Sequence, residues 1–175
     1  MPERKTMNTV EALPKTTETL KTTVLCDEYP DARACELQFR IFGPRAFQGT
    51  IRTVRCLEDN ALLRRVLSQP GQGNVMVVDG GGSLRTALMG DLMARLAMQN
   101  GWAGAVIYGA VRDVGALDNL DFAVKALGSI PKRSGKTGTG EVDVPVTFGG
   151  ITFSPGHWLC SDENGVVVLA QAPPT

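Results

Sequence analysis

The adjacent pair Arg112-Asp113 combines two side chains that could act on a small anionic substrate. It follows an apolar segment, residues 104–108 (GAVIY), that we expect to be a buried strand, and ligands of parallel α/β folds bind at the carboxyl ends of such strands. The planar guanidinium of Arg112 suits a carboxylate, and the Asp113 carboxylate is a hard oxygen ligand suited to Mg²⁺ or Mn²⁺. An adjacent Arg-Asp pair is more often a solvated loop pair, so spacing alone leaves both interpretations open.

A second candidate is Gly90-Asp91-Leu92-Met93. If a helix begins here, its free N–H groups converge on one spot and the helix dipole favours an anion there, such as a small carboxylate. The alternative is that Gly90 is a glycine inside a helix that runs from Ser83 to about Asn100. Spacing alone favours this alternative.

Two glycine-containing segments resemble phosphate-binding loops without matching them. Residues 79–83 (DGGGS) follow an expected strand, but Arg85 stands where the dinucleotide fingerprint needs its third glycine. Residues 135–137 (GKT) end like a P-loop, but Ile130 occupies the position of the first glycine. We therefore expect residues 79–83 to form a tight turn where two backbones approach closely.

Three basic residues, Lys132, Arg133 and Lys136, lie in a polar, glycine-rich segment at residues 131–140. They could contact phosphate or RNA, but a solvated mobile loop is the favoured interpretation. A Schiff-base lysine needs a desolvating pocket, and no lysine stands in an obviously apolar strand.

Composition limits the classes of function. Lys plus Arg and Asp plus Glu both number 18, and this balance argues against a nucleic-acid binder that relies on a basic face. The four cysteines match no zinc or disulfide framework and predict reduced thiols. The single histidine, His157, is expected in a partly exposed turn. With no apolar run long enough to span a bilayer, we expect a cytoplasmic protein without membrane contact.

The order of predicted elements indicates an α/β domain. Residues 1–22 lack a signal-peptide core and are predicted to be a flexible N-terminal extension, followed by one domain at 23–175. Strands are expected at 47–56, 74–79 and 104–108, with helices at 58–68 and up to Asn100, where Leu92, Met93, Leu96 and Ala97 form one apolar face. This order implies a parallel crossover.

The last third is predicted to be rich in strands. Residues 122–127 and 129–130 are expected to form a short helix and a strand. Short strands separated by turn residues then follow at 144–148, 151–153, 158–161 and 166–169. The simplest arrangement places helices on one side of mixed β layers.

Residues 77–113 (VVDGGGSLRTALMGDLMARLAMQNGWAGAVIYGAVRD) closely resemble the regulator of ribonuclease activity A family. Further matches are LCDEYPD at 25–31, CLEDN at 56–60, GTGEVDVPVTFGG at 138–150 and DENGVVVL at 162–169. The resemblance extends from about Thr23 to the end. This family is similar to 4-hydroxy-4-methyl-2-oxoglutarate aldolases, which are divalent-metal enzymes that also decarboxylate oxaloacetate.

The resemblance implies a fold, an assembly and a site. The fold would be a swivelling β/β/α three-layer domain with mixed sheets, assembled as a homotrimer with sites between subunits. The backbone of Gly90, Asp91, Leu92 and Met93 would hold the pyruvate carboxylate, and Arg112 would bind substrate oxygens. Asp113 would anchor Mg²⁺ or Mn²⁺, and Asp91 would assist through a water molecule.

The resemblance also implies two functions. One is a lyase that acts on small oxo-acids, by aldol cleavage or oxaloacetate decarboxylation, and the retention of Asp113 favours it. The other is a non-catalytic regulator that binds a ribonuclease or a helicase. Tyr108 stands where aldolases often carry an aspartate, and the sequence as a whole looks closer to the regulator branch.

Overall fold

Four parallel strands form the centre of the fold in the computed structural model, which describes residues 19–174. They are β3 (Phe47–Arg55), β4 (Val75–Asp79), β6 (Gly104–Val111) and β7 (Ala123–Ser129), and each pairs in parallel with the next. The predicted parallel crossover from β4 to β6 is confirmed. Their apolar residues are buried on both faces, as expected for a parallel sheet covered on both sides.

Antiparallel strands extend this sheet at both ends. The order is β1-β12-β11-β3-β4-β6-β7-β2, with β5 on β6 and β8 on β3, and a separate hairpin joins β9 and β10. The antiparallel strands are β1 (Arg33–Ala34), β2 (Arg40–Phe42), β8 (Glu141–Val142), β9 (Val146–Phe148), β10 (Ile151–Phe153), β11 (Trp158–Asp162) and β12 (Gly165–Leu169), whereas β5 (Ala87–Met89) pairs with β6 in parallel. The β-rich last third is thereby confirmed.

The side chains of β4 divide the interior into two cores. Met76 and Val78 pack with the helices α2 (Ala61–Leu67), α3 (Asp91–Gln99) and α4 (Val114–Asp118). Val75 and Val77 point the other way, into a cluster shared with the β9–β10 hairpin and with β11 and β12. Since successive strand residues face opposite sides, this alternation builds the expected β/β/α three-layer arrangement.

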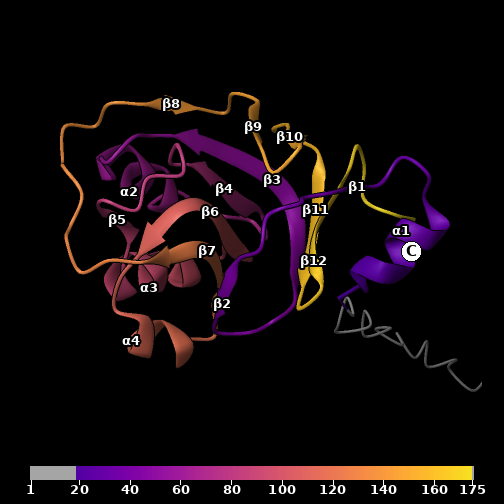
Figure 1. The fold of residues 1–175 in the computed structure, drawn as a ribbon, viewed down its shortest axis with the longest axis horizontal. Helices are drawn as coiled ribbons and strands as arrows, with labels where there is room; N and C mark the ends of the chain where they lie inside the picture. Colours follow the sequence, from indigo (N-terminus) through magenta and orange to yellow (C-terminus); the bar gives the residue numbers. More distant parts are fainter. Residues whose placement is uncertain (1–18, 175) are drawn as a thin grey trace, which may run out of the picture.

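The remaining helix, α1 (Thr22–Glu28), lies apart from the other three. Figure 1 shows α2, α3 and α4 gathered at one side of β4, β6 and β7, while β11, β12 and α1 lie at the opposite end of the molecule. Leu25 of α1 packs with Trp158 and Leu169 in a small third core. Of the predicted N-terminal extension, residues 1–18 lie outside the described residues, and Thr22 donates two hydrogen bonds to Asp162.

Two helix predictions are wrong. The helix expected from Ser83 begins at Asp91, because Ala87–Met89 instead form β5 beside β6, and Gly90 is the extended residue before the helix. Its buried face consists of Met93, Ala94 and Ala97, while Leu92 is exposed. The helix expected at 122–127 is strand β7, and the helix of this region lies earlier, at Val114–Asp118. A short apolar run has no period that separates helix from strand.

The expectation that no lysine stands in an apolar strand is also wrong. Lys125 lies in the middle of β7 and is 2% exposed. Its Nζ donates hydrogen bonds to the backbone carbonyls of Asp162 and Gly165, at 2.5 and 3.1 Å. The lysine therefore ties the turn of the β11–β12 hairpin to the central sheet.

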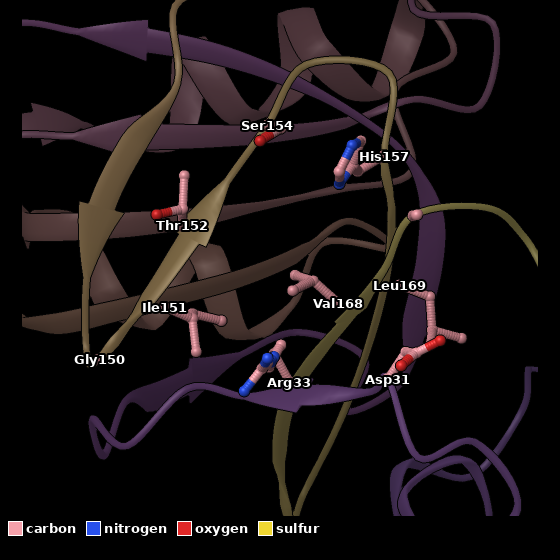
Figure 2. A pocket seen from close by; sticks show the side chains of 10 residues that line it. Asp31, Arg33, Gly150, Ile151, Thr152, Ser154, His157, Val168 and Leu169 are labelled. Atoms are coloured by element: carbon pink, nitrogen blue, oxygen red, sulfur yellow. The ribbon is translucent and has the colours of Figure 1, made fainter.

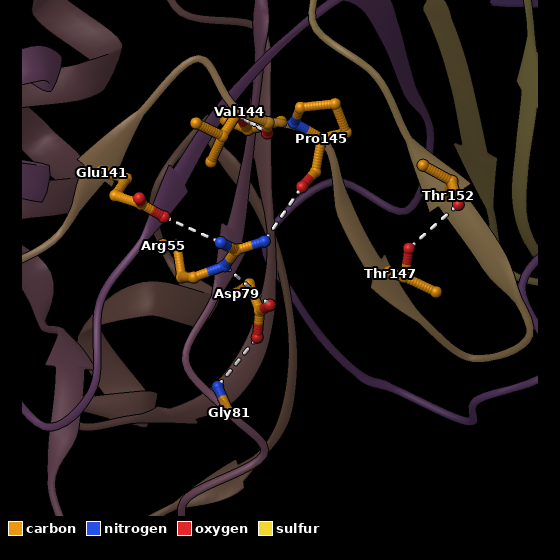
Figure 3. A network of polar contacts seen from close by, with 9 residues as sticks. Arg55, Asp79, Gly81, Glu141, Val144, Pro145, Thr147 and Thr152 are labelled. Carbon is orange, nitrogen blue, oxygen red and sulfur yellow. Dashed lines mark hydrogen bonds and ion pairs between the residues drawn. The ribbon is translucent and has the colours of Figure 1, made fainter.

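A polar network holds the C-terminal end of β3 next to the glycine turn at residues 79–83 (Figure 3). Arg55 donates hydrogen bonds to Glu141 of β8 at 2.7 Å and to the Pro145 carbonyl at 3.0 Å. Its Nε lies 3.7 Å from Asp79, whose carboxylate accepts the Gly81 N–H. Gly80 allows the expected close approach, since a Cβ there would lie 2.8 Å from the Tyr108 carbonyl oxygen.

The remaining expectations concern thiols and membranes. All four cysteines are free, and Cys35, Cys56 and Cys160 are buried, as predicted for reduced thiols. No helix among residues 19–174 is long and apolar enough to cross a bilayer.

Candidate active site

The candidate site lies at the carboxyl ends of β5 and β6. Parallel pairing places Met89 opposite Val111, so the next residues of each chain segment, Gly90 and Arg112, come side by side. The Arg112 N–H donates to the Met89 carbonyl at 2.9 Å and continues the pairing one residue past the strand. This position is where parallel α/β sheets usually bind ligands.

Gly90 brings the start of α3 into contact with Asp113. The Asp91 N–H donates to Oδ2 of Asp113 at 3.3 Å. A Cβ at position 90 would lie 2.5 Å from this Oδ2 and 3.3 Å from Cγ of Arg112, closer than real Cβ atoms tolerate. The backbone of Gly90 is extended and does not itself need glycine, but any larger residue there would displace the Asp113 carboxylate from the start of α3.

Arg112 and Asp113 keep much of their polar surface free. Nε of Arg112 lies 3.9 Å from Oδ2 of Asp113, and Nη1 lies 3.5 Å from the Pro131 carbonyl, so neither contact is a tight hydrogen bond. Asp113 adopts the left-handed conformation, with φ 57° and ψ 41°, at the residue before α4. Asp91 pairs loosely with Arg95, at 3.9 Å on the same helix.

These groups line a cavity of about 110 Å³, and the structure gathers all six predicted site residues there. Sequence reasoning did not place four other polar lining residues at this site: Asn60, Arg64, Arg133 and Lys136. Four basic side chains thus face two carboxylates, those of Asp91 and Asp113. This excess of positive charge favours an anionic ligand.

The segment that carries Arg133 and Lys136 is exposed to solvent over most of its length, as expected, but its backbone is held by hydrogen bonds to other segments. Ser134 is buried and donates to the Ala87 carbonyl at 2.7 Å. Gly135 donates its N–H to the Glu58 carbonyl at 2.9 Å. No local sequence pattern indicates these contacts, since they join segments that lie more than 40 residues apart.

The donor set suits a hard divalent cation held by few protein ligands. Within residues 19–174, no group of three His, Cys, Asp or Glu side chains is placed to hold a metal ion. Oδ1 of Asp113 accepts no hydrogen bond from the described residues, so it is free to bind a cation. Mg²⁺ commonly binds through one or two carboxylates and completes its shell with water and substrate oxygens, which fits this site.

The other chemistry-bearing residues lie elsewhere. His157 is partly exposed in the expected turn before β11, and it faces a separate hollow of about 470 Å³ with Arg33 on the opposite wall (Figure 2). Tyr108 stacks on Phe148, with ring centroids 4.8 Å apart, in the core beside the β9–β10 hairpin.

The three-layer fold, with an Arg-Asp pair and a helix start meeting at one sheet edge, defines the class of swivelling β/β/α domains. Within that class, the family model described as RraA-like, Aldolase/RraA, matches residues 22–168. The chain belongs to this family, which confirms the resemblance to the regulator of ribonuclease activity A family. The family includes both ribonuclease inhibitors and aldolase-like or decarboxylase-like members.

Solved structures agree with this assignment. The RNA-processing inhibitor RraA from Thermus thermophilus is 47% identical, with a TM-score of 0.87 over 90% of this chain and 96% of that chain. A structure described as an S-adenosylmethionine:2-dimethylmenaquinone methyltransferase from Geobacillus kaustophilus is 41% identical, with a TM-score of 0.86 over 87% and 96%. Streptomyces coelicolor RraAS2, from the RNase ES inhibitor RraA family, is 29% identical, with a TM-score of 0.67 over 79% and 72%.

Proposed function

We propose that the protein is a divalent-metal-dependent lyase of pyruvate-type oxo-acids. Its reaction would be oxaloacetate decarboxylation, aldol cleavage of 4-hydroxy-4-methyl-2-oxoglutarate, or both. The observation that carries this proposal is the meeting of the α3 start, Arg112 and Asp113 around one cation-rich cavity. The family's aldolase-like members support it.

Each residue has a role set by its chemistry. The first-turn N–H groups of α3, at Gly90 to Met93, would hold the substrate carboxylate, since the amides of a helix start and the helix dipole favour an anion. Arg112 would direct its guanidinium at the ketone oxygen, where cleavage of the neighbouring C–C bond leaves negative charge. Asp113 would hold Mg²⁺ or Mn²⁺, and Asp91 would orient a water molecule beside it. The bound cation would supply Lewis-acid stabilisation of the developing charge.

The test is a coupled assay of pyruvate release from oxaloacetate with added Mg²⁺ or Mn²⁺, corrected for catalysis by the metal alone. We expect activity well above that blank, lost when EDTA is in excess and restored when the metal is returned. A folded sample with no activity above the blank would refute the lyase proposal. The same samples, assayed with 4-hydroxy-4-methyl-2-oxoglutarate, would separate decarboxylation from aldol cleavage.

A second candidate is a non-catalytic regulator of RNA degradation that acts by binding a ribonuclease E-type enzyme or a helicase. The observation that favours it is the 47% identity to the Thermus protein described as an RNA-processing inhibitor. Purified chain should then capture such a partner at micromolar concentration and slow RNA cleavage by the ribonuclease or RNA unwinding by the helicase. Absence of a complex at those concentrations would count against this candidate. The two functions can coexist, because a partner surface can lie on an active enzyme.

A further inference from the structure

The hollow that His157 faces is separate from the candidate active site, because the two share no lining residue. It has a volume of about 470 Å³ and lies between strand β10 and the neighbouring strands β12 and β1 (Figure 2). Residues 150–152 and Ser154 line it, so that one edge of β10 borders the hollow along its length. Neither proposed role uses these residues.

The edge of β10 that borders the hollow is unpaired. Among the strands of residues 19–174, β10 pairs only with β9, through a two-residue turn at residues 149–150, where φ is 61° and 79°. The residues that flank such a turn, Phe148 and Ile151, exchange hydrogen bonds, so the next pair directs its N–H and C=O groups outward. That pair is Thr147 and Thr152, whose hydroxyls lie 2.9 Å apart. The backbone of Thr152 thus offers a donor and an acceptor to the hollow.

The floor of the hollow is apolar. Ile151 and Val168 line it, and both belong to the core that the β9–β10 hairpin shares with β11 and β12. An extended chain laid along β10 would place every second side chain on this floor, because successive residues of a strand face opposite sides. The hollow therefore offers both the backbone groups and the apolar surface that an added strand needs.

A cation stands at one end of the hollow. Arg33 lies opposite Val168 in the register of β1 and β12, and Figure 2 shows its side chain beside Gly150 and Ile151, where β10 begins. Arg33 forms no ion pair with any described residue. Asp31 also lines the hollow, but its carboxylate points away from Arg33, toward Leu169 (Figure 2). The guanidinium is thus available to a carboxylate from outside the chain.

Ser154 and His157 stand at the other end of the hollow (Figure 2). The turn that carries them is fixed, since the Ser154 carbonyl accepts the His157 N–H at 3.1 Å and the His157 carbonyl accepts the Ile51 N–H at 2.7 Å. Both ends of the hollow are therefore set by ordered backbone. A chain running antiparallel to β10 would enter beside His157 and reach Arg33 last.

We propose that this hollow binds the extended C-terminal segment of a partner protein as a third strand of the β9–β10 hairpin. The segment pairs with the N–H and C=O groups of Thr152, and its last side chain, which is apolar, rests on Ile151 and Val168. Its terminal carboxylate binds Arg33. Charge complementarity supports a chain end, because the side chains of an added strand point to the floor or to solvent, whereas Arg33 stands where the strand would stop.

Binding of two fluorescein-labelled tetrapeptides to the full chain, measured by fluorescence anisotropy, tests the role of Arg33. Both have the sequence Thr-Val-Thr-Val, and one ends in a free carboxylate whereas the other ends in an amide. We expect the acid to bind at least about tenfold more tightly, the effect of one charge-assisted hydrogen bond. Arg33→Met should remove this preference and leave the affinity for the amide within about twofold. Equal binding of the two peptides, or no binding at high micromolar protein, overturns the inference.

Two controls accompany this comparison. Arg65→Met removes an exposed arginine of α2 that does not line the hollow, and it should keep the preference of the parent protein. A loss in this control equal to that in Arg33→Met overturns the role of Arg33. The amidated peptide Thr-Val-Thr-Asp carries its carboxylate on a side chain and should bind as weakly as the first amide. Binding as tight as that of the acid would contradict the assignment to a chain end.

Peptides that are N-methylated at one backbone amide at a time test the strand pairing. Only alternate N–H groups of a strand face its neighbour, so methylation should weaken binding at least about fivefold at alternate positions and little between them. Uniform effects along the peptide, or none, would contradict an added strand.

Thr152→Pro tests the same pairing from the side of the protein. Proline removes the N–H that faces the hollow and is tolerated at the open edge of a strand. We expect the acid and the amide to weaken by the same factor, at least about fivefold, so that the preference for the acid remains. Thr152→Ala keeps the N–H and should bind both peptides as the parent protein does. Normal binding by a folded Thr152→Pro variant overturns the pairing, and if this variant does not fold, the methylated peptides decide alone.

Discussion

Asp113 is the residue on which the lyase proposal depends most directly. Asp113→Asn keeps the shape of the side chain but removes the negative charge that would hold the cation. We expect kcat/KM for oxaloacetate to fall at least about a hundredfold, with the thermal unfolding midpoint little changed. The matched control is Asp118→Asn, an exposed aspartate on α4, which should retain full activity. Full activity in Asp113→Asn would remove the basis for a metal site here.

Gly90 gives an independent test of the same geometry. In Gly90→Ala the new Cβ would meet Oδ2 of Asp113 at 2.5 Å, so the carboxylate must move away from the start of α3. We expect kcat/KM to fall at least about tenfold without loss of the fold. Gly115→Ala is the control, because a Cβ there meets no atom within 4 Å. Equal activity of both variants would show that the contact between Gly90 and Asp113 is dispensable.

The cysteines allow a prediction about accessibility. Burial raises the pKa of the Cys56 and Cys160 thiols to about 12 and also raises that of Cys35. Since the thiolate is the reactive form, these three thiols should react slowly with a thiol-specific reagent, while the exposed Cys26 reacts quickly. Titration of the native protein should therefore show one fast thiol per chain, rising to four in denaturant. Two or more fast thiols would contradict the buried positions.

At the residue scale, the sequence predicted the two short segments of the site, residues 90–93 and 112–113, but not the residues that come to the cavity from elsewhere. Arg112-Asp113 could be placed because they follow a recognisable apolar strand. Asn60, Arg64 and Lys136 could not, since they come to the cavity through contacts such as that between Asn60 and Leu88. Charged residues in polar segments carry no sequence signal of such packing.

At the scale of helices and strands, β7 shows why a local sequence pattern cannot always distinguish a strand from a helix. Its residues AVKALGS contain alanine, leucine and lysine, which favour helices, and the sequence period did not contradict a helix. Pairing with β6 and β2 on both sides decides in favour of the strand. Strands β4 and β6 were predicted because a run of consecutive apolar residues between turn residues is typical of a strand buried on both faces.

Lys125 of β7 makes the stability of the fold depend on pH in alkaline solution. Burial lowers its pKa to about 8, whereas the unfolded chain keeps the ordinary value of 10.5. Between these values the unfolded state binds more protons, so this group makes the free energy of unfolding rise with pH, by at most about 1.4 kcal/mol per pH unit. Below pH 8 both states are protonated and the contribution of Lys125 is constant.

Urea unfolding of the parent protein and of Lys125→Met, from pH 7 to pH 10, measures this contribution as the difference between the two curves. The difference should be flat up to about pH 8 and then change in favour of the parent protein. Taking the difference removes the contributions of Lys136 and Cys56, whose pKa values do not depend on Lys125. Parallel curves over the whole range would show that Lys125 titrates as an exposed lysine does.

The whole molecule is expected to act as a homotrimer, as the resemblance implies. The chain mass is 18.7 kDa, so light scattering coupled to size exclusion should give about 56 kDa. Leu92, which is 74% exposed and lines the cavity, would be covered by a neighbouring subunit beside the site. A monomer mass at micromolar concentration would contradict this assembly and leave each site bounded by one chain.

The hydrogen bonds that Asp59 accepts from Thr137 and Gly138 bear on how this protein could diverge from its relatives. The groups proposed for chemistry sit on the sheet edge, whereas residues 132–138 form another wall of the cavity and are held by hydrogen bonds to Ala87, Glu58, Asp59 and Asn60. Residues 132–138 are therefore one contiguous part of the site that can vary separately from the sheet edge. Evolution could change the sequence of this segment, or an engineer could replace it, and so alter the ligand-facing wall while the residues on the sheet edge stay the same.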